Sequence, residues 1–208
     1  RSENESGVAF TTPTTNGRST LISPEAIFRT ETESVTPTML NTYDHSDFVA
    51  TELTSRLPGP VSVVVPTRNT AGTIAATVAE LLILAEGGLI EQILVVDADS
   101  PDGTAVTARD AGAEVVSENE LMAGTGDVRG KGDAMWRSLE AVNGEIVVFI
   151  DGDIADFGRH YVTGLLGALC ADVATRFVKG SYRRPFRQQT SEQPAGGGRV
   201  TELTARPL

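Results

Sequence analysis

Short apolar runs alternate with amphipathic segments through the central part of the chain. Residues 61–66 form a β-branched run that ends at a proline, and residues 92–97 form an apolar run that ends at an aspartate. Residues 145–150 form the most apolar run of all. Such runs are typical of strands buried in a parallel sheet. A shorter run at residues 114–116 predicts a further strand.

Segments with apolar residues at helical spacing follow these strands. They cover residues 73–85, 104–111 and 133–142. The alternation predicts an α/β fold, with an open, mostly parallel sheet and helices on both faces. In such sheets ligands bind at the carboxyl ends of the strands, where the strand order reverses. Three polar segments are expected there: residues 66–70, 97–100 and 151–153.

The first part of the chain follows neither period. Residues 1 to about 45 are rich in Thr, Ser, Asn and Glu, and the sequence Leu57-Pro58-Gly59-Pro60 marks the entry to the folded part. We therefore expect a mobile tail over residues 1–56 and one domain over residues 57–208.

Composition excludes several classes of function. A net charge of −11 argues against binding to nucleic acid or to anionic membranes, since phosphate-rich surfaces attract clustered Lys and Arg. One cysteine excludes an internal disulfide, and the two histidines are too far apart in sequence to suggest a metal-binding pair. No apolar run is long enough to span a membrane, and no signal pattern is present. The expected compartment is the cytoplasm.

Asp151-Gly152-Asp153 directly follows the most apolar strand. Two carboxylates at the end of a buried strand are unfavourable unless a positive charge compensates them. Mg²⁺ or Mn²⁺ would suit this position, because these ions share their coordination among one or two carboxylates, waters and substrate phosphates. The alternative is a surface turn, in which Asp-Gly-Asp is common.

Lys131 lies in a glycine-rich segment, Arg129-Gly130-Lys131-Gly132, just before a predicted helix. Backbone amides and an ammonium in this position could bind a diphosphate. The spacing of a P-loop is not met, because Gly132 stands where that motif needs Ser or Thr. An exposed basic loop is the alternative.

Other candidates carry weaker signals. Asp97 could contact a ligand, whereas Ser100 or Asp102 could cap the helix that follows. The basic residues near the C-terminus could bind a phosphorylated or carboxylated substrate or form a solvated turn; they are Lys179, Arg183, Arg184, Arg187 and Arg199. Core positions are expected for Met135, Trp136, Leu139 and Cys170.

Five segments together resemble those of GT-A glycosyltransferases, and more narrowly the glucosyl-3-phosphoglycerate synthase family. They are VSVVVPTRN (61–69), GKGDAMWRSL (130–139), VVFIDGD (147–153), VKGSYRRP (178–185) and GGGRVTELTARP (196–207). The resemblance covers roughly residues 57–208. It implies transfer of glucose from UDP-glucose to 3-phosphoglycerate with retention of the anomeric configuration, dependence on Mg²⁺ or Mn²⁺, and a possible homodimer.

The resemblance also implies roles for individual residues. Pro66, Thr67, Arg68, Asn69 and Thr70 would line the uridine, and Ala98 would lie at the base. Lys131 would bind the nucleotide, Asp151 and Gly152 would lie at the ribose and diphosphate, and Asp153 would ligate the metal. Lys131 and Asp153 would thus act in catalysis. The acceptor would bind at Gly198, Arg199, Val200 and Thr201.

The chain departs from the family at several points. Thr70 replaces a typical Glu and Ala98 a typical Ser, and the family's later helical region, which supplies a histidine ligand, has no counterpart. Neither His45 nor His160 falls at the matching position. We therefore expect a truncated form. Three alternatives stay open: a UDP-sugar-binding module without turnover, a transferase that uses GDP-mannose or another acceptor, and a nonfunctional remnant. A Rossmann dehydrogenase is excluded, since no Gly-x-Gly-x-x-Gly follows the first strand.

Overall fold

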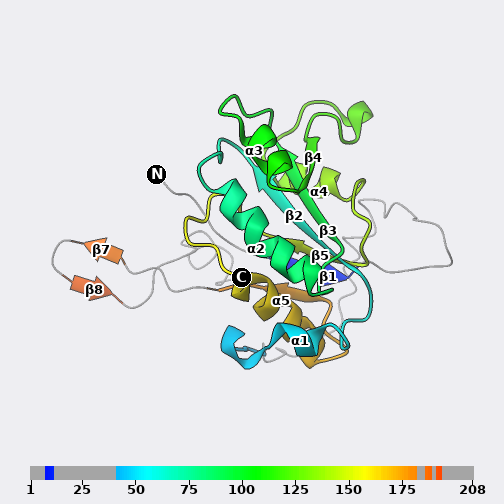
Figure 1. Ribbon diagram of the computed structural model, residues 1–208, viewed down its shortest axis with the longest axis vertical. Coiled ribbons are helices and arrows are strands. Elements are labelled where there is room, and N and C mark those ends of the chain that lie inside the picture. Colours follow the sequence, from blue (N-terminus) through cyan, green and yellow to red (C-terminus); the bar gives the residue numbers. More distant parts are fainter. Residues whose placement is uncertain (1–7, 12–40, 182–185, 189–190, 194–208) are drawn as a thin grey trace, which may run out of the picture.

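The computed structural model describes residues 8–11, 41–181, 186–188 and 191–193. Its centre is a six-stranded sheet with the order β4-β3-β2-β5-β1-β6 (Figure 1). The four strands expected from the sequence are β2 (Val61–Thr67), β3 (Gln92–Asp97), β4 (Glu114–Ser117) and β5 (Ile146–Phe149). They are parallel to one another, which confirms the predicted mostly parallel sheet.

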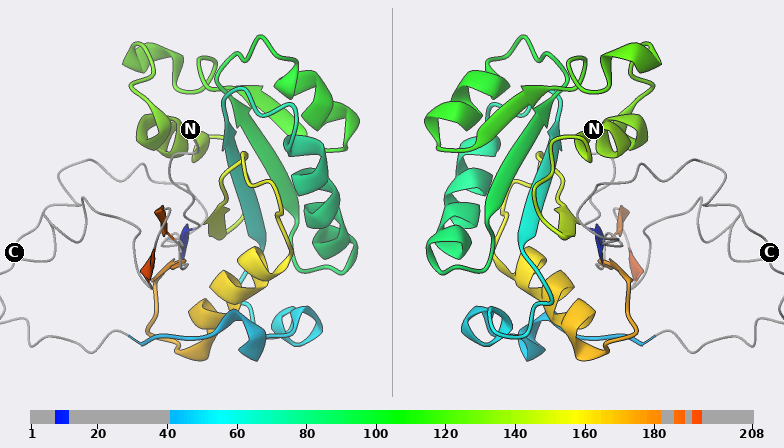
Figure 2. Two further views of the ribbon diagram at one scale, coloured as in Figure 1. Left: turned by 90° about the vertical axis from the view of Figure 1, so that its left-hand side faces the viewer. Right: turned by 90° about the vertical axis from the view of Figure 1, so that its right-hand side faces the viewer.

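Helices cover both faces of this sheet. They are α2 (Ile74–Glu86), α3 (Thr104–Asp110), α4 (Lys131–Ser138) and α5 (His160–Ala171). Figure 2 shows α2 and α3 on one side of the strands and α4 on the other. The three helices expected from periodicity are therefore present, whereas α5 was not predicted.

Side chains alternate between the two faces along each strand, as the period of two requires. Along β2, Val63 and Val65 belong to a core cluster that includes α2 and α5, whereas Val64 packs in a second cluster beneath α4. Met135 of α4 and Leu139, which directly follows α4, pack against the second cluster as predicted. The following members of the first cluster come from helices: Ile74, Val78, Leu81, Ala108, Val162, Leu165, Leu166 and Leu169.

The N-terminal segment contributes more structure than the sequence indicated. Strand β1 (Val8–Thr11) lies antiparallel between β5 and β6 (Phe177–Lys179). The short helices η2 (His45–Asp47) and α1 (Ala50–Leu53) lie beside α5 in Figure 1. The expected tail over residues 1–56 is therefore wrong for these segments.

Burial against α5 explains why residues 45–53 are ordered. Leu53 is 1% exposed. A Cβ atom at Gly167 would lie 2.1 Å from the ring of Phe48, and one at Gly164 would lie 2.9 Å from Cβ of His45. The two glycines of α5 thus create the space in which the segment packs. Scattered apolar residues can fill such a space without following a helical or strand period.

The fold also bears on three other features of the sequence. His45 and His160 are neighbours in space, with ring centroids 4.8 Å apart. Cys170 is partly buried, and burial raises the pKa of its thiol. None of the helices in the described part of the chain is both long and apolar enough to cross a membrane.

Beyond the main sheet, β7 (Phe186–Gln188) and β8 (Ser191–Gln193) form an antiparallel pair.

Candidate functional site

The order of the strands reverses between β2 and β5. From β2 the chain continues to β3 and β4 on one side, whereas β5 pairs with the other edge of β2. Ligands of open α/β sheets bind at the carboxyl ends of the strands beside such a reversal. Two segments meet there: residues 67–73, which lead from β2 into α2, and residues 150–153, which follow β5.

Asp97, the last residue of β3, links the ends of two strands. Asp97 is 3% exposed, and its carboxylate accepts hydrogen bonds from the hydroxyls of Thr67 (3.0 Å) and Ser100 (2.7 Å). The Ser100 amide donates a further bond to Asp97 Oδ2 (2.7 Å). Ser100 Oγ also accepts a bond from the Asn69 amide (2.9 Å). The Asp97 carboxylate therefore holds the end of β2 to the loop that follows β3.

Asp102 provides a second link between the same loops. Its Oδ1 accepts hydrogen bonds from the hydroxyl (2.6 Å) and amide (3.0 Å) of Thr104, and its Oδ2 accepts one from the Ala71 amide (3.0 Å). These bonds, that of the Thr104 hydroxyl above all, hold the pKa of Asp102 below its usual value. Asp102, rather than Ser100, therefore bonds the first turn of α3.

Thr70 is held by this arrangement and leaves one polar atom unused. Its amide donates to Thr104 Oγ1 (2.8 Å), and the residue is 7% exposed. Thr70 Oγ1 is buried and makes no hydrogen bond to any residue that the structure describes. A buried hydroxyl without a partner is unfavourable. Thr70 is thus a residue of this loop whose buried side-chain oxygen has no partner among the described residues.

Gly152 permits the closest approach between β2 and the segment that follows β5. A Cβ atom there would lie 2.7 Å from Thr67 Cγ2 and 3.4 Å from the Pro66 carbonyl oxygen. The Thr73 hydroxyl donates a hydrogen bond to the Gly152 carbonyl (2.7 Å). Any side chain at position 152 would therefore displace the end of β2. The close packing and the Thr73 bond also fix the backbone between Asp151 and Asp153.

Lys131, the first residue of α4, brings a positive charge to these aspartates. Its ammonium contacts Oδ1 of Asp151, whose side chain is 2% exposed, while the Lys131 side chain is 49% exposed. Burial lowers the pKa of Lys131, and the negative charge of Asp153 opposes that shift. Gly130 precedes the helix with φ 107°, in the region that favours glycine. The structure thus brings Lys131 and Asp151 together, although 20 positions separate them in the sequence.

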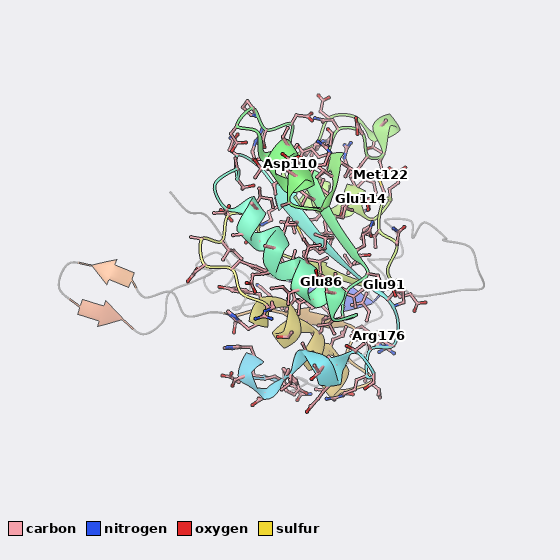
Figure 3. All side chains as sticks on the ribbon, in the orientation of Figure 1. Glu86, Glu91, Asp110, Glu114, Met122 and Arg176 are labelled. Carbon is pink, nitrogen blue, oxygen red and sulfur yellow. The ribbon has the colours of Figure 1, made fainter. Side chains whose placement is uncertain are left out.

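Arg137 is the buried long side chain of α4, in place of the expected Trp136. Arg137 is 2% exposed and Trp136 is 45% exposed. The guanidinium pairs with Asp133 (3.3 Å) and donates to the carbonyls of Leu121 (3.3 Å) and Gly126 (2.7 Å). These bonds hold residues 121–126, in the loop that precedes α4, against the helix. Sequence patterning missed Arg137, because an arginine at a core position carries no apolar signal. Figure 3 labels Met122, which lies in the loop before α4, and Glu91, which directly precedes β3.

The two aspartates fit a cation that shares its ligands with a bound molecule. Asp153 is exposed and Asp151 is buried, so a plain surface turn does not describe the pair. Within the described residues, no group of three or more His, Cys, Asp or Glu side chains could hold a metal. Mg²⁺ and Mn²⁺ are suited to one or two carboxylates with waters and phosphate oxygens, whereas structural Zn²⁺ needs four protein ligands.

Most of the predicted site residues converge at this end of the sheet. Residues 66–70 lie at the end of β2, and the Ala98 amide donates to the Thr67 carbonyl (3.0 Å). Gly152 contacts the same strand end from the other side. The Thr67 hydroxyl donates to Asp97 and the Thr67 carbonyl accepts from Ala98, so both groups already have protein partners. The predicted acceptor residues, Gly198, Arg199, Val200 and Thr201, lie outside the described residues.

Comparison with known proteins gives a consistent picture. Residues 62–195 match the profile of a family described as glycosyl transferase family 2. The glucosyl-3-phosphoglycerate synthase of Mycolicibacterium smegmatis is 43% identical over 151 residues, which are 71% of this chain and 48% of that protein. This chain thus spans about half the length of the curated relatives that it matches.

Two solved structures are similar over most of this chain. Mannosyl-3-phosphoglycerate synthase from Rubrobacter xylanophilus has a TM-score of 0.70 and 50% identity, with coverage of 79% of this chain and 52% of that one. Glucosyl-3-phosphoglycerate synthase from Mycobacterium tuberculosis, in complex with Mn²⁺, UDP and glucosyl-3-phosphoglycerate, has a TM-score of 0.61 and 34% identity. The coverage there is 80% of this chain and 55% of that one.

Proposed function

Because this chain belongs to glycosyl transferase family 2, we propose that it supplies the donor-binding part of a metal-dependent retaining transferase that moves glucose from UDP-glucose to 3-phosphoglycerate. The observation that carries the proposal is the contact of Lys131 with Asp151 at the strand reversal, with Asp153 near enough for its charge to act on Lys131. The named relatives, which include a complex with Mn²⁺, UDP and glucosyl-3-phosphoglycerate, support this choice of substrates.

In this proposal each site residue has a defined task. Residues 66–70 and Ala98 hold the nucleoside, and Asp151 with Gly152 lies beside the ribose and diphosphate. Asp153 holds Mg²⁺ or Mn²⁺, which when bound would neutralise charge that develops on the leaving diphosphate. Lys131 adds a second positive charge beside the same group.

The acceptor side of the proposal rests on the family resemblance alone. Arg199, with Gly198, Val200 and Thr201, would hold 3-phosphoglycerate through charge-assisted hydrogen bonds. None of these side chains needs to act as a nucleophile, because attack on the face that the diphosphate leaves also gives retention. A homodimer and a cytoplasmic location belong to the same proposal.

A second candidate differs in the sugar donor. The structure of 50% identity is a mannosyl-3-phosphoglycerate synthase, and this chain has Thr70 and Ala98 where the glucosyl family typically has Glu and Ser. Both changes fall in the loops proposed to hold the nucleoside. A donor such as GDP-mannose is therefore the specific competitor to UDP-glucose.

Thermal unfolding in the presence of donors tests the proposal. UDP and UDP-glucose with Mn²⁺, at about a hundredfold excess over Kd, should raise Tm by about 5 °C, and GDP-mannose should raise it less. Asp153→Ala should abolish the shift, whereas Asp156→Ala, which removes the same charge from the same loop, should retain it. A larger shift with GDP-mannose would favour the second candidate, and no shift with any nucleotide would refute the donor site.

Turnover separates a transferase from a module that only binds. Release of UDP from UDP-glucose should depend on added 3-phosphoglycerate if the chain is active. Nucleotide-dependent stabilisation without any acceptor-dependent release would mean that this chain binds the donor but transfers nothing.

A further inference from the structure

Lys131 places a positive charge beside the buried carboxylate of Asp151, close to Asp153, where the metal is proposed to bind. Its ammonium contacts the buried carboxylate of Asp151, and Asp153 is near enough for its negative charge to act on Lys131. One ammonium therefore acts on two carboxylates, by contact on Asp151 and at longer range on Asp153. A divalent ion that reached the same oxygens would meet that positive charge, and like charges in a partly buried site repel strongly.

The surroundings of Lys131 would allow its side chain to leave. The side chain is 49% exposed, and glycines flank it at positions 130 and 132. Apart from chain neighbours and the backbone of α4 itself, no atom lies within 4 Å of a Cβ built at Gly130 or Gly132. Asp151, by contrast, is fixed at the end of β5 by the close packing of Gly152 against Thr67.

We propose that Lys131 is an internal counter-ion. In the nucleotide-free protein it offsets part of the negative charge of Asp151 and Asp153, and when a nucleoside diphosphate binds, its ammonium moves to the diphosphate and leaves the carboxylates to the metal. This rests on the proposed function and deepens it by assigning a binding order. Metal alone binds weakly, since it must displace Lys131. The diphosphate removes that obstacle, so metal and nucleotide bind cooperatively, and the coupling is reciprocal.

Binding of Mn²⁺ without nucleotide tests the proposal directly. Electron paramagnetic resonance reports free Mn²⁺, and isothermal titration gives Kd. Lys131→Met should bind Mn²⁺ about tenfold more tightly than the unmodified chain, because the competing ammonium is gone. In the unmodified chain, UDP should tighten Mn²⁺ binding by about the same factor, and in Lys131→Met this gain should be lost.

Matched variants separate this contact from general charge effects. Lys131→Arg keeps a cation at the site and should leave Mn²⁺ binding weak. Arg129→Met removes a positive charge two residues away and should leave the Kd for Mn²⁺ unchanged. Circular dichroism and thermal melting establish that each variant is folded, and Lys131→Gln replaces Lys131→Met if the latter is not.

The decisive comparison needs no nucleotide. Equal Kd values for Mn²⁺ in the unmodified chain and in the folded Lys131→Met or Lys131→Gln variant would overturn the proposal. Equally tight binding in Arg129→Met and Lys131→Met would also overturn it, because net charge would then explain the effect. Failure of UDP to bind any of these proteins would refute the proposed donor site instead, and the Mn²⁺ comparison would still decide the role of Lys131.

Discussion

Gly152 occupies a position where chain geometry dictates the residue. Replacement by Ala would place a Cβ atom 2.7 Å from Thr67 Cγ2, and Thr67 is held by its bond to Asp97. We expect Gly152→Ala to lower the free energy of unfolding by about 1–3 kcal/mol, as overpacking does elsewhere. Urea denaturation measures this change.

Gly72→Ala is the matched control for that measurement. Gly72 is exposed, and a Cβ atom there would meet no other atom within 4 Å. Its stability should change by no more than about 0.5 kcal/mol. A loss of stability as large as that of Gly152→Ala would show that the cost arises from removal of glycine flexibility and not from the contact with Thr67.

Aspartates that look alike in the sequence have different tasks in the structure. Asp97 and Asp151 both follow apolar runs, yet Asp97 accepts its hydrogen bonds from Thr67 and Ser100, whereas Asp151 contacts Lys131. The sequence predicted the site segments from strand ends alone. It could not assign the partners Thr67 and Lys131, because each comes from another element 20 or more positions away in the chain.

At the scale of elements, Arg137 links α4 to the loop that precedes it. Arg137→Met would leave the carbonyls of Leu121 and Gly126 without this donor and Asp133 without its cation. We expect the free energy of unfolding to fall by about 3 kcal/mol. This value is near the lower end for breaking a buried ion pair, because the Asp133 side chain is 22% exposed. Chemical denaturation measures this loss.

Hydrogen exchange locates the same effect within the chain. In folded Arg137→Met, amides of residues 121–130 should exchange faster, while those of β2 and β3 should keep their protection. The Arg137→Lys variant would retain the charge but not the forked geometry, and should recover only part of the stability. Unchanged exchange in the loop would contradict the proposed clamp.

The boundaries of α4 show how accurately the spacing of apolar residues predicts where a helix begins and ends. The pattern predicted a helix over residues 133–142, whereas α4 is Lys131–Ser138. Gly130 sets the start with its left-handed φ, and the Asp133 side chain accepts a bond from the Arg129 amide (2.9 Å). Apolar spacing contains neither signal. The two-residue shift matters, because it puts Lys131 in the first turn of the helix, beside Asp151.

At the scale of the whole molecule, the sheet depends on a strand from the far N-terminal part of the chain. β1 lies between β5 and β6, which are not adjacent to each other, so it supplies the hydrogen-bonding partners of both. The parallel part of the sheet followed from alternating runs of apolar residues. This insertion did not, because four residues in a polar context give too short a pattern.

A designed disulfide tests that placement. Ala9 and Val178 are partners in the antiparallel ladder, where Cα atoms lie about 4.5–5.5 Å apart, within the ~4.4–6.8 Å that a disulfide spans. With Cys170→Ser to remove the native thiol, Ala9→Cys/Val178→Cys should form a crosslink within one chain under mild oxidation. Non-reducing peptide mapping by mass spectrometry identifies it.

The control shifts the register by one residue. Ala9→Cys/Phe177→Cys places the two thiols on opposite faces of the sheet, because side chains alternate along a strand, so it should not crosslink. A crosslink between two chains in the Ala9→Cys/Val178→Cys protein would mean that copies exchange β1. Equal crosslinking in both double variants, or none in either, would contradict the observed register. The hydrogen bonds that β1 makes to β5 and β6 would then have to come from another segment.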